Sequence, residues 1–351
     1  MARTWMIGAY MTFVAVLCAA AVLPQGPFAG TAHSGAAFRF NKVADGVYHV
    51  VGTGAMAVVG NSAVIVNDDD VILVDDHASP AAEWVLLQEL RTITDKPVRT
   101  VINTHFHFDH AHGNQVFGRD VQIIGHEFTR EMLLGGKSAQ MPLYKGYVTR
   151  LPAQIQDLRQ RWAAETDAAR KAALQIQLQS AENNAASQAE LKPTPPNVTL
   201  RSELTLYRGS REIQIRFLGR AHTAGDLVIY LPREKIAITG DLLTADLSNM
   251  SDAYVNEWVG TLDELQKLDF TTVLPGHGEA FTDRNKIDYF QAYLADVWTE
   301  VGRLKRQGLS AEDAAARADL TKHRPHFPGI TAPGVPLIGV TRIYELLDAQ
   351  K

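Results

Sequence analysis

Four apolar stretches of the sequence end directly in a histidine or an aspartate, and this feature constrains the fold more than any other. The runs VRTVINT, EIQIRFLGRA, KIAITG and TTVLPG lead into His105, His222, Asp241 and His277. Buried strands usually end in turn residues such as glycine or asparagine. In sheets that carry helices on their faces, functional groups collect at the strand ends, where the loops converge. The pattern therefore predicts an α/β fold whose strand ends meet at one site.

The first of these runs continues into THFHFDHAHGN, residues 104–114, which holds four of the 12 histidines of the chain. With the other strand ends it supplies five imidazoles and two carboxylates: His105, His107, Asp109, His110, His222, Asp241 and His277. A catalytic zinc site takes three protein ligands, whereas structural sites favour cysteine and close at four. Seven ligands without cysteine divide into two sites of three that share one carboxylate, which is typical of two-metal hydrolytic centres.

The remaining histidines are interpreted without a chemical role. His112 does not follow the alternating pattern of the other histidines in THFHFDHAHGN, so we expect it behind the ligands or on the surface. A lone histidine is usually a hydrogen-bonded structural residue. This interpretation applies to His49, His77, His126, His323 and His326.

The beginning of the chain differs from the rest. Arg3 is the only charge before Arg39, and residues 6–23 are apolar and rich in alanine. A short positive start, an apolar stretch and a small-residue exit predict a secretory signal peptide over residues 1–32, with an uncleaved membrane anchor as the alternative. The single cysteine, Cys18, lies inside this segment. We therefore expect export to the periplasm or the medium, no membrane attachment after cleavage, and metal ligands that are nitrogen or oxygen.

Element patterns divide the rest of the chain. Short β-branched runs between residues 47 and 74 predict antiparallel strands joined by hairpins. Residues 152–192 are rich in Ala, Gln, Glu and Arg with apolar residues at helical spacing, and KPTPP follows, so we expect an inserted helix or helical hairpin. Further helices are expected over residues 80–93, 256–268 and a C-terminal extension at 284–351 that is broken by a loop at 323–336.

Charge excludes one class of partner. The formal net charge is −5 and no basic stripe is present, so nucleic acid is not an expected partner. The expected partner is a small-molecule substrate. The sequence leaves the oligomeric state open.

The motifs taken together resemble those of the metallo-β-lactamase fold superfamily. They occur in the order of that family: VDD at 74–76, HFHFDH at 105–110 for HxHxDH, GRAHTAGD at 219–226, ITGD at 238–241 and PGHG at 275–278. The resemblance covers about residues 40–285. It implies a four-layer αβ/βα sandwich with two metal ions at one edge between the sheets, and makes residues 33–351 one hydrolase domain.

The resemblance also implies a role for each residue. One metal is held by His105, His107 and His222. The other is held by Asp109, His110 and His277, with Asp241 bridging the two ions and Asp75 supporting the ligands from behind. Two zinc ions are the default for such ligands, and manganese or iron also suits a bridging carboxylate.

Two positions separate the chain from the best-known β-lactamases of the superfamily. Those enzymes carry a cysteine where this chain has Asp241, and a lysine three residues later, where it has Thr244. A bridging aspartate resembles instead glyoxalase II, the lactonases and related hydrolases. The expected reaction is hydrolysis of an ester, lactone, thioester or amide by a metal-bound hydroxide, with Asp109 as the catalytic residue that orients it and passes a proton to the leaving group.

Three alternatives to this function stay open. They are a β-lactam-hydrolysing enzyme, a mononuclear iron oxidoreductase that resembles persulfide dioxygenases, and a non-catalytic metal-binding protein that recruits a partner through the helices of 152–192. The complete second set of ligands favours the dinuclear hydrolase over the last two.

Three loops are predicted to surround the substrate. Residues 242–256 and 321–336 are expected to form pocket walls. GTGAMAV at 52–58 is expected to be a mobile hairpin tip over the metals, in which Met56 contacts the substrate. An ordinary tight turn far from the site is the alternative.

Overall fold

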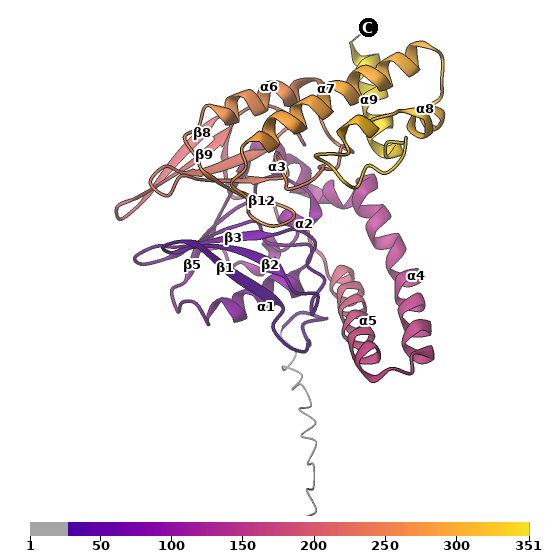
Figure 1. Cartoon of the computed structure of the whole chain (residues 1–351). Helices are drawn as coiled ribbons and strands as arrows, with labels where there is room; N and C mark the ends of the chain where they lie inside the picture. Colours follow the sequence, from indigo (N-terminus) through magenta and orange to yellow (C-terminus); the bar gives the residue numbers. More distant parts are fainter. Residues whose placement is uncertain (1–26, 351) are drawn as a thin grey trace, which may run out of the picture.

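Two β-sheets packed face to face, with helices on the outer side of each, make up the computed structural model of the protein (Figure 1). The structure describes residues 27–350, so most of the predicted signal segment lies outside the described residues. The predicted αβ/βα sandwich is confirmed.

The first sheet has seven strands in chain order. Neighbours from β1 to β4 are antiparallel, as predicted for residues 47–74, and neighbours from β4 to β7 are parallel. The strands are β1 (Phe38–Ala44), β2 (Val47–Gly52), β3 (Ser62–Val66), β4 (Val71–Val74), β5 (Val98–Ile102), β6 (Gln122–His126) and β7 (Val198–Leu200).

The second sheet has five strands in the order β12-β11-β10-β9-β8, and only β11 and β12 are parallel. They are β8 (Glu203–Arg208), β9 (Arg211–Phe217), β10 (Leu227–Leu231), β11 (Ile236–Gly240) and β12 (Thr272–Pro275). Every residue of β10 and β11 is buried, because one face packs on the first sheet and the other lies under helices. This double burial explains their uninterrupted apolar sequences.

One cluster of aliphatic side chains joins the two sheets. It contains Ile65, Ile72 and Ile102 from the first sheet and Ile215 and Ile229 from the second. Burial of such side chains contributes roughly 1.5–3 kcal/mol each. The cluster therefore fixes the position of one sheet on the other, and with it the relative position of their strand ends.

Helices cover the outer faces close to the predicted ranges. The outer helices are α1 (Pro80–Leu90), capped by the Ser79 side chain, on the first sheet and α6 (Val255–Gln266) and α7 (Asn285–Arg306) on the second. The shorter helices are α2 (Phe108–Ala111), α3 (Glu127–Leu133), α8 (Ala311–Arg317) and α9 (Leu337–Ala349), with 3₁₀ turns at Asn114–Val116, Leu134–Gly136, Ser138–Gln140 and Thr321–His323.

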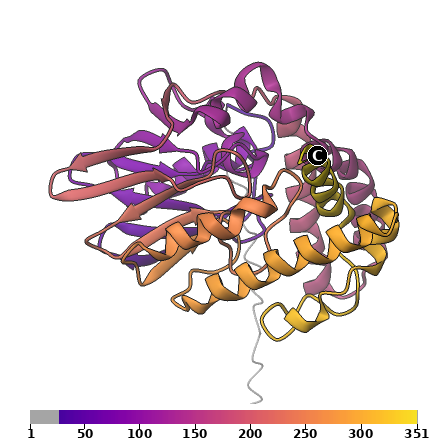
Figure 2. The same ribbon diagram turned by 90° about the horizontal axis from the view of Figure 1, so that it is seen from above.

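The inserted segment is a helical hairpin made of α4 (Pro142–Ala164) and α5 (Ala168–Ala189). It begins ten residues before the predicted start at 152, and Pro152 lies inside α4, on the exposed face. Figures 1 and 2 show the hairpin on the same side of the sandwich as α8 and α9.

Candidate metal centre

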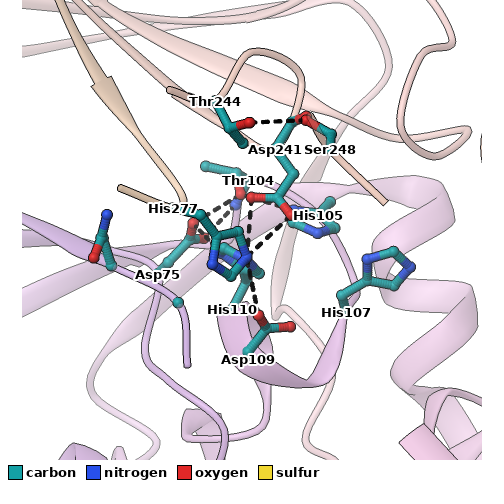
Figure 3. Close-up of polar contacts among 12 residues, drawn as sticks. Asp75, Thr104, His105, His107, Asp109, His110, Asp241, Thr244, Ser248 and His277 are labelled. Atoms are coloured by element: carbon teal, nitrogen blue, oxygen red, sulfur yellow. Dashed lines mark hydrogen bonds and ion pairs between the residues drawn. The ribbon is translucent and has the colours of Figure 1, made fainter. Parts of the chain in front are cut away.

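The seven predicted ligands meet at one end of the sandwich, where strands of both sheets end (Figure 3). The segment after β5 supplies His105 and His107, and α2 directly behind it carries Asp109 and His110. The second sheet supplies the other three from the β9–β10 connection, the end of β11 and the end of β12: His222, Asp241 and His277. Residues more than 100 positions apart therefore lie side by side, because the two sheets end together.

Ligand atoms of these residues lie within 4.8 Å of one another in three groups. We call His105, His107 and His222 the histidine set, and Asp109, His110 and His277 the carboxylate set. The third group contains Asp241, whose Oδ2 lies 3.5 Å from His222 Nε2 and 3.2 Å from His277 Nε2. Asp241 thus lies between the two sets, where the resemblance places a bridging ligand.

Several buried polar atoms of the centre have no hydrogen-bond partner in the described part of the chain. They include His105 Nε2, His110 Nε2 and Asp241 Oδ1. Buried polar atoms are normally satisfied, and an orphaned atom calls for an explanation such as an ion. Imidazole nitrogens and carboxylate oxygens are ligands of Zn²⁺ and of Mn²⁺ or Fe²⁺. The donor set therefore fits divalent cations.

Asp75 holds the ligands from behind, in the place predicted for it. Its Oδ1 accepts a hydrogen bond from the Thr104 backbone N–H at 2.7 Å, and its Oδ2 lies 2.9 Å from His110 Nδ1. A carboxylate on one ring nitrogen orients the imidazole and increases its basicity, which leaves Nε2 directed at the site. Asp75 has a φ of 61°, an unusual conformation that this network of contacts supports.

Asp252 is a functional residue that the sequence analysis missed. Its Oδ2 lies 3.0 Å from His107 Nε2, so that His107 Nδ1 faces His222 Nε2 at 2.9 Å. Burial would raise the pKa of Asp252, but hydrogen bonds from His107 and Ser251 bring it below its usual value. Asp252 lies in the loop 242–256, which was predicted only as a pocket wall, and no motif marks it.

The two sets differ in charge. Burial, together with the neighbouring imidazoles, lowers the pKa of His222 to about 3, so this ring is neutral at pH 7. Burial also lowers the pKa of His277, but Asp241 and Asp109 outweigh that effect and raise it to about 10. Burial would raise the pKa of both carboxyls, yet the adjacent His110 and His277 hold them well below their usual range. The carboxylate set thus pairs ionised carboxylates with protonated imidazoles.

Glycine is required at one point of the centre. A Cβ atom on Gly276 would collide with the Asp241 carboxylate and would lie 2.8 Å from His110 Cε1. The backbone after β12 can approach the ligands this closely only without a side chain. This contact explains the first glycine of PGHG.

Thr244 occupies the position where the best-known β-lactamases carry lysine. Its hydroxyl donates to the Asp246 carbonyl at 2.6 Å and lies 3.2 Å from Ser248 Oγ. Ser248 Oγ in turn donates to the Asp241 carbonyl at 2.9 Å. Thr244 is buried and shapes the loop behind Asp241, so it offers no cation to a substrate carboxylate.

Most other histidines have structural contacts, as predicted. His112 is buried behind the ligands and contacts Ser138 Oγ at 2.9 Å, and burial lowers its pKa to about 3. The ring nitrogens of His49, His77, His126 and His323 contact Pro275 O, Ser62 Oγ, Phe128 N and Asp296 Oδ2. His326 differs from the prediction, since it is exposed and stacks on Tyr289 with ring centroids 3.5 Å apart.

The loop between β2 and β3 only partly matches its prediction. It does reach the centre, because Gly60 packs against the Asp109 carbonyl and the His110 ring. Met56, however, is 3% exposed and packs in the core of the first sheet with Phe38 and Val50. The correction has a simple cause: the loop folds back onto the sheet, and its exposed apolar side chain is Val59 instead.

A two-sheet sandwich with a histidine and aspartate cluster at one edge defines a class of metal-dependent hydrolases. The family profile of the "Metallo-beta-lactamase superfamily" matches residues 55–277, and the chain belongs to this superfamily.

Individual relatives are distant. A linear primary-alkylsulfatase of Pseudomonas sp. is 24% identical over 271 residues, which are 70% of this chain and 47% of that enzyme. A type 2 metallo-β-lactamase of Bacillus cereus is 35% identical over 86 residues, 23% of this chain and 34% of that enzyme. The chain thus spans about half or less of the curated relatives it matches.

Solved structures share the fold. A metallo-β-lactamase from Pontibacter korlensis aligns with a TM-score of 0.53 at 18% identity, over 74% of this chain and 99% of that one. At this identity the likeness supports the sandwich architecture and nothing finer.

Proposed function

We propose that the protein is a dinuclear hydrolase that cleaves an ester, lactone, thioester or amide bond. The observation that carries this proposal is the position of Asp241 between two complete ligand sets at the open edge of the sandwich. His277 is 36% exposed and marks the side on which a substrate reaches the centre.

The residues of the centre have distinct tasks in this proposal. Two divalent cations, when bound, would lower the pKa of a bound water molecule and polarise the scissile carbonyl. Asp109 is ionised at neutral pH, because its pKa lies well below the usual range, and its Oδ2 lies 3.2 Å from His277 Nε2. It is therefore placed to accept a proton from the attacking water and return it to the leaving group. Asp75 and Asp252 keep His110 and His107 in their orientations.

A dedicated β-lactamase is disfavoured in this proposal, because Thr244 replaces the lysine and Asp241 the cysteine of the best-known enzymes. A second candidate substrate class comes from the alkylsulfatase, which matches 70% of this chain, whereas the Bacillus cereus β-lactamase matches 23%. Sulfate esters of primary alcohols therefore join the carboxylic esters as candidates.

The test is a substrate panel on protein of measured metal content. It contains carboxylic esters, lactones, thioesters, β-lactams and alkyl sulfates, with oxygen uptake on a persulfide as the probe for iron oxygenase chemistry. His107→Ala is expected to abolish hydrolysis while the far-ultraviolet circular dichroism of the protein is unchanged. Full turnover in that variant would sink the assignment, and oxygen uptake without hydrolysis would replace the hydrolase by an oxygenase.

Export is also a proposal. Within residues 27–350 no helix is both long and apolar enough to cross a membrane. The Ala29 backbone N–H donates to Glu190 at 2.9 Å, Gly30 packs against the Asn183 backbone of α5, and the Asn183 side chain donates to the Ala32 carbonyl. We therefore place the end of the proposed signal before Ala29, earlier than 32. N-terminal sequencing of the protein from a periplasmic fraction tests both points, and a chain that starts at residue 33 would refute the revised boundary.

A further inference from the structure

A groove runs between the α4–α5 hairpin and the β2–β3 loop, outside the metal centre. Its volume is about 420 Å³, and its walls come from residues 54–59 and from both helices of the hairpin. Sites for small molecules have volumes of roughly 300–1,000 Å³. The groove is therefore large enough for a substantial part of a ligand.

One stripe of α4 forms a long wall of the groove. The stripe consists of Tyr147, Leu151, Gln154, Leu158 and Arg161, which recur every three or four residues and so share one helix face. With a rise of 1.5 Å per residue, this stripe extends over roughly 20 Å. A linear ligand suits these dimensions better than a compact one.

One end of the groove adjoins the metal centre. Tyr147 stacks on Phe108 with ring centroids 4.6 Å apart, and Phe108 directly precedes Asp109. Val59, in the opposite wall, directly precedes Gly60, which packs on Asp109 and His110. Both walls thus lead to the turn that carries the ligands of the carboxylate set.

The chemistry of the groove changes along its length. Tyr147 and Asn184, hydrogen bonded to each other at 2.6 Å, lie at the inner end. Arg161 and Asp157 form an ion pair of 3.4 Å at the outer end. Between them lie the apolar side chains of Met56, Val58, Val59, Leu151, Leu158 and Ala181, together with the polar side chains of Gln154, Gln177 and Ser180. The apolar side chains between the polar ends suit a hydrocarbon chain whose reactive end lies at the metals.

We infer that this groove binds a linear hydrocarbon arm of the substrate, while the scissile bond of the same molecule lies at the metal centre. The inference rests on the proposed function and narrows it to esters with a medium or long acyl or alkyl chain. It also gives the inserted hairpin a role in specificity.

The test uses two matched variants of α4 in metal-loaded protein. Gln154→Trp fills the groove from its wall, whereas Gln156→Trp puts the same side chain on an exposed position that does not line the groove. The readout is the ratio of kcat/KM for a decanoyl ester to that for the butyryl ester of the same phenol. Each buried methylene raises kcat/KM by at most about fourfold.

In the wild-type protein and in Gln156→Trp the ratio is expected to be far above one. In Gln154→Trp it is expected to fall by at least about tenfold, since the indole displaces several methylenes. An equal ratio in all three proteins overturns the inference while the proposed function stands. Such a result would leave the hairpin face to a protein partner.

If no ester is hydrolysed, the proposed function is refuted and the kinetic test cannot be applied. A binding measurement then tests the groove without turnover. Decanoate and acetate are titrated into the same proteins by calorimetry, since both carboxylates reach the metals and only one has a long chain. Decanoate is expected to bind at least about tenfold more tightly than acetate, and Gln154→Trp is expected to remove that difference. Equal affinities for the two acids in the wild-type protein would overturn the inference independently of turnover.

Discussion

The histidine set and the carboxylate set of the metal centre are built on the same strand ends, yet they differ in charge and in access. His105, His107 and His222 are all buried, and Asp252 orients one of them from behind. The carboxylate set contains Asp109 and the partly exposed His277, whose pKa is raised to about 10. The histidine set is thus closed to solvent and contains the neutral His222, whereas the carboxylate set is open on one side and pairs its carboxylates with protonated histidines.

This difference indicates a division of labour. A neutral imidazole needs no proton exchange before it binds a cation, so His222 in the histidine set is ready for a metal at pH 7. In the carboxylate set, His277 must first lose a proton. Asp241 belongs to both sets, which makes it the residue through which a change in one reaches the other.

Asp241→Asn is expected to have the largest effect. Removal of the shared charge weakens both sets, and activity is expected to fall on the order of 10³-fold. Metal analysis of the purified variant should show loss at both positions. Asp246→Asn, an exposed aspartate of the same loop, is the matched control. Full metal content in Asp241→Asn would contradict a bridging role.

His222→Ala and His277→Ala each remove a ligand from one set. Each variant is expected to retain one metal ion instead of two and to lose activity by about 10²–10³-fold. Titration with a colorimetric chelator measures the metal content. If either variant loses both ions, the two sets are not separate binding sites.

Asp252→Asn and Asp75→Asn test the two sets more gently, through the residues that orient the ligands. Asp252 contacts His107 and Asp75 contacts His110, so the first variant should weaken the histidine set and the second the carboxylate set. The expected loss of metal affinity is about 10–100-fold in each case. The same loss at both sets in either variant would show that orientation is shared across the centre.

The pH dependence of metal binding should also distinguish the two sets. The raised pKa of His277, about 10, keeps its ring protonated at neutral pH, so metal binding there displaces a proton. The proton lost from His277 should therefore raise the affinity of the carboxylate set by up to about tenfold per pH unit until about pH 10, and the proton of His110, whose pKa is also raised, should add to that slope. His222, with a pKa of about 3, is already neutral and adds no slope to the histidine set above pH 5. Calorimetric titrations between pH 6 and 9 measure both, and a single common slope would refute the distinction.

The fold and the candidate ligands could be predicted from the sequence because both depend on residue types whose physical chemistry is specific: apolar residues for buried strands, and histidine and aspartate for metal binding. Ile102 ends an apolar strand shortly before His105, and Gly240 ends another directly before Asp241. Such a sequence predicts both a buried strand and a candidate metal ligand at its end. Two sheets with helices outside follow from strands that are apolar throughout, as β10 and β11 are.

The remaining features depend on loop paths and on packing. Asp252 reaches His107 across 145 residues of sequence, and one aspartate in a polar loop carries no mark of that contact. The start of α4 lies before Pro152, the first residue of the predicted helix, since a proline inside a helix is tolerated on an exposed face. The sequence could not show where Met56 lies, because an apolar side chain suits either a flap over the site or the core. The path of its loop places it in the core of the first sheet.

The origin of the ligands has a consequence for the integrity of the molecule. His105, His107, Asp109 and His110 belong to the half of the chain that builds the first sheet, and His222, Asp241 and His277 to the half that builds the second. Beyond Cys18 the chain has no cysteine, so no disulfide within the chain can link these halves. A cation held by both halves would stabilise the folded protein against unfolding. The gain in unfolding free energy is about 4 kcal/mol at a free cation concentration 1,000 times the dissociation constant. Chelation would then loosen the sandwich at its functional edge first.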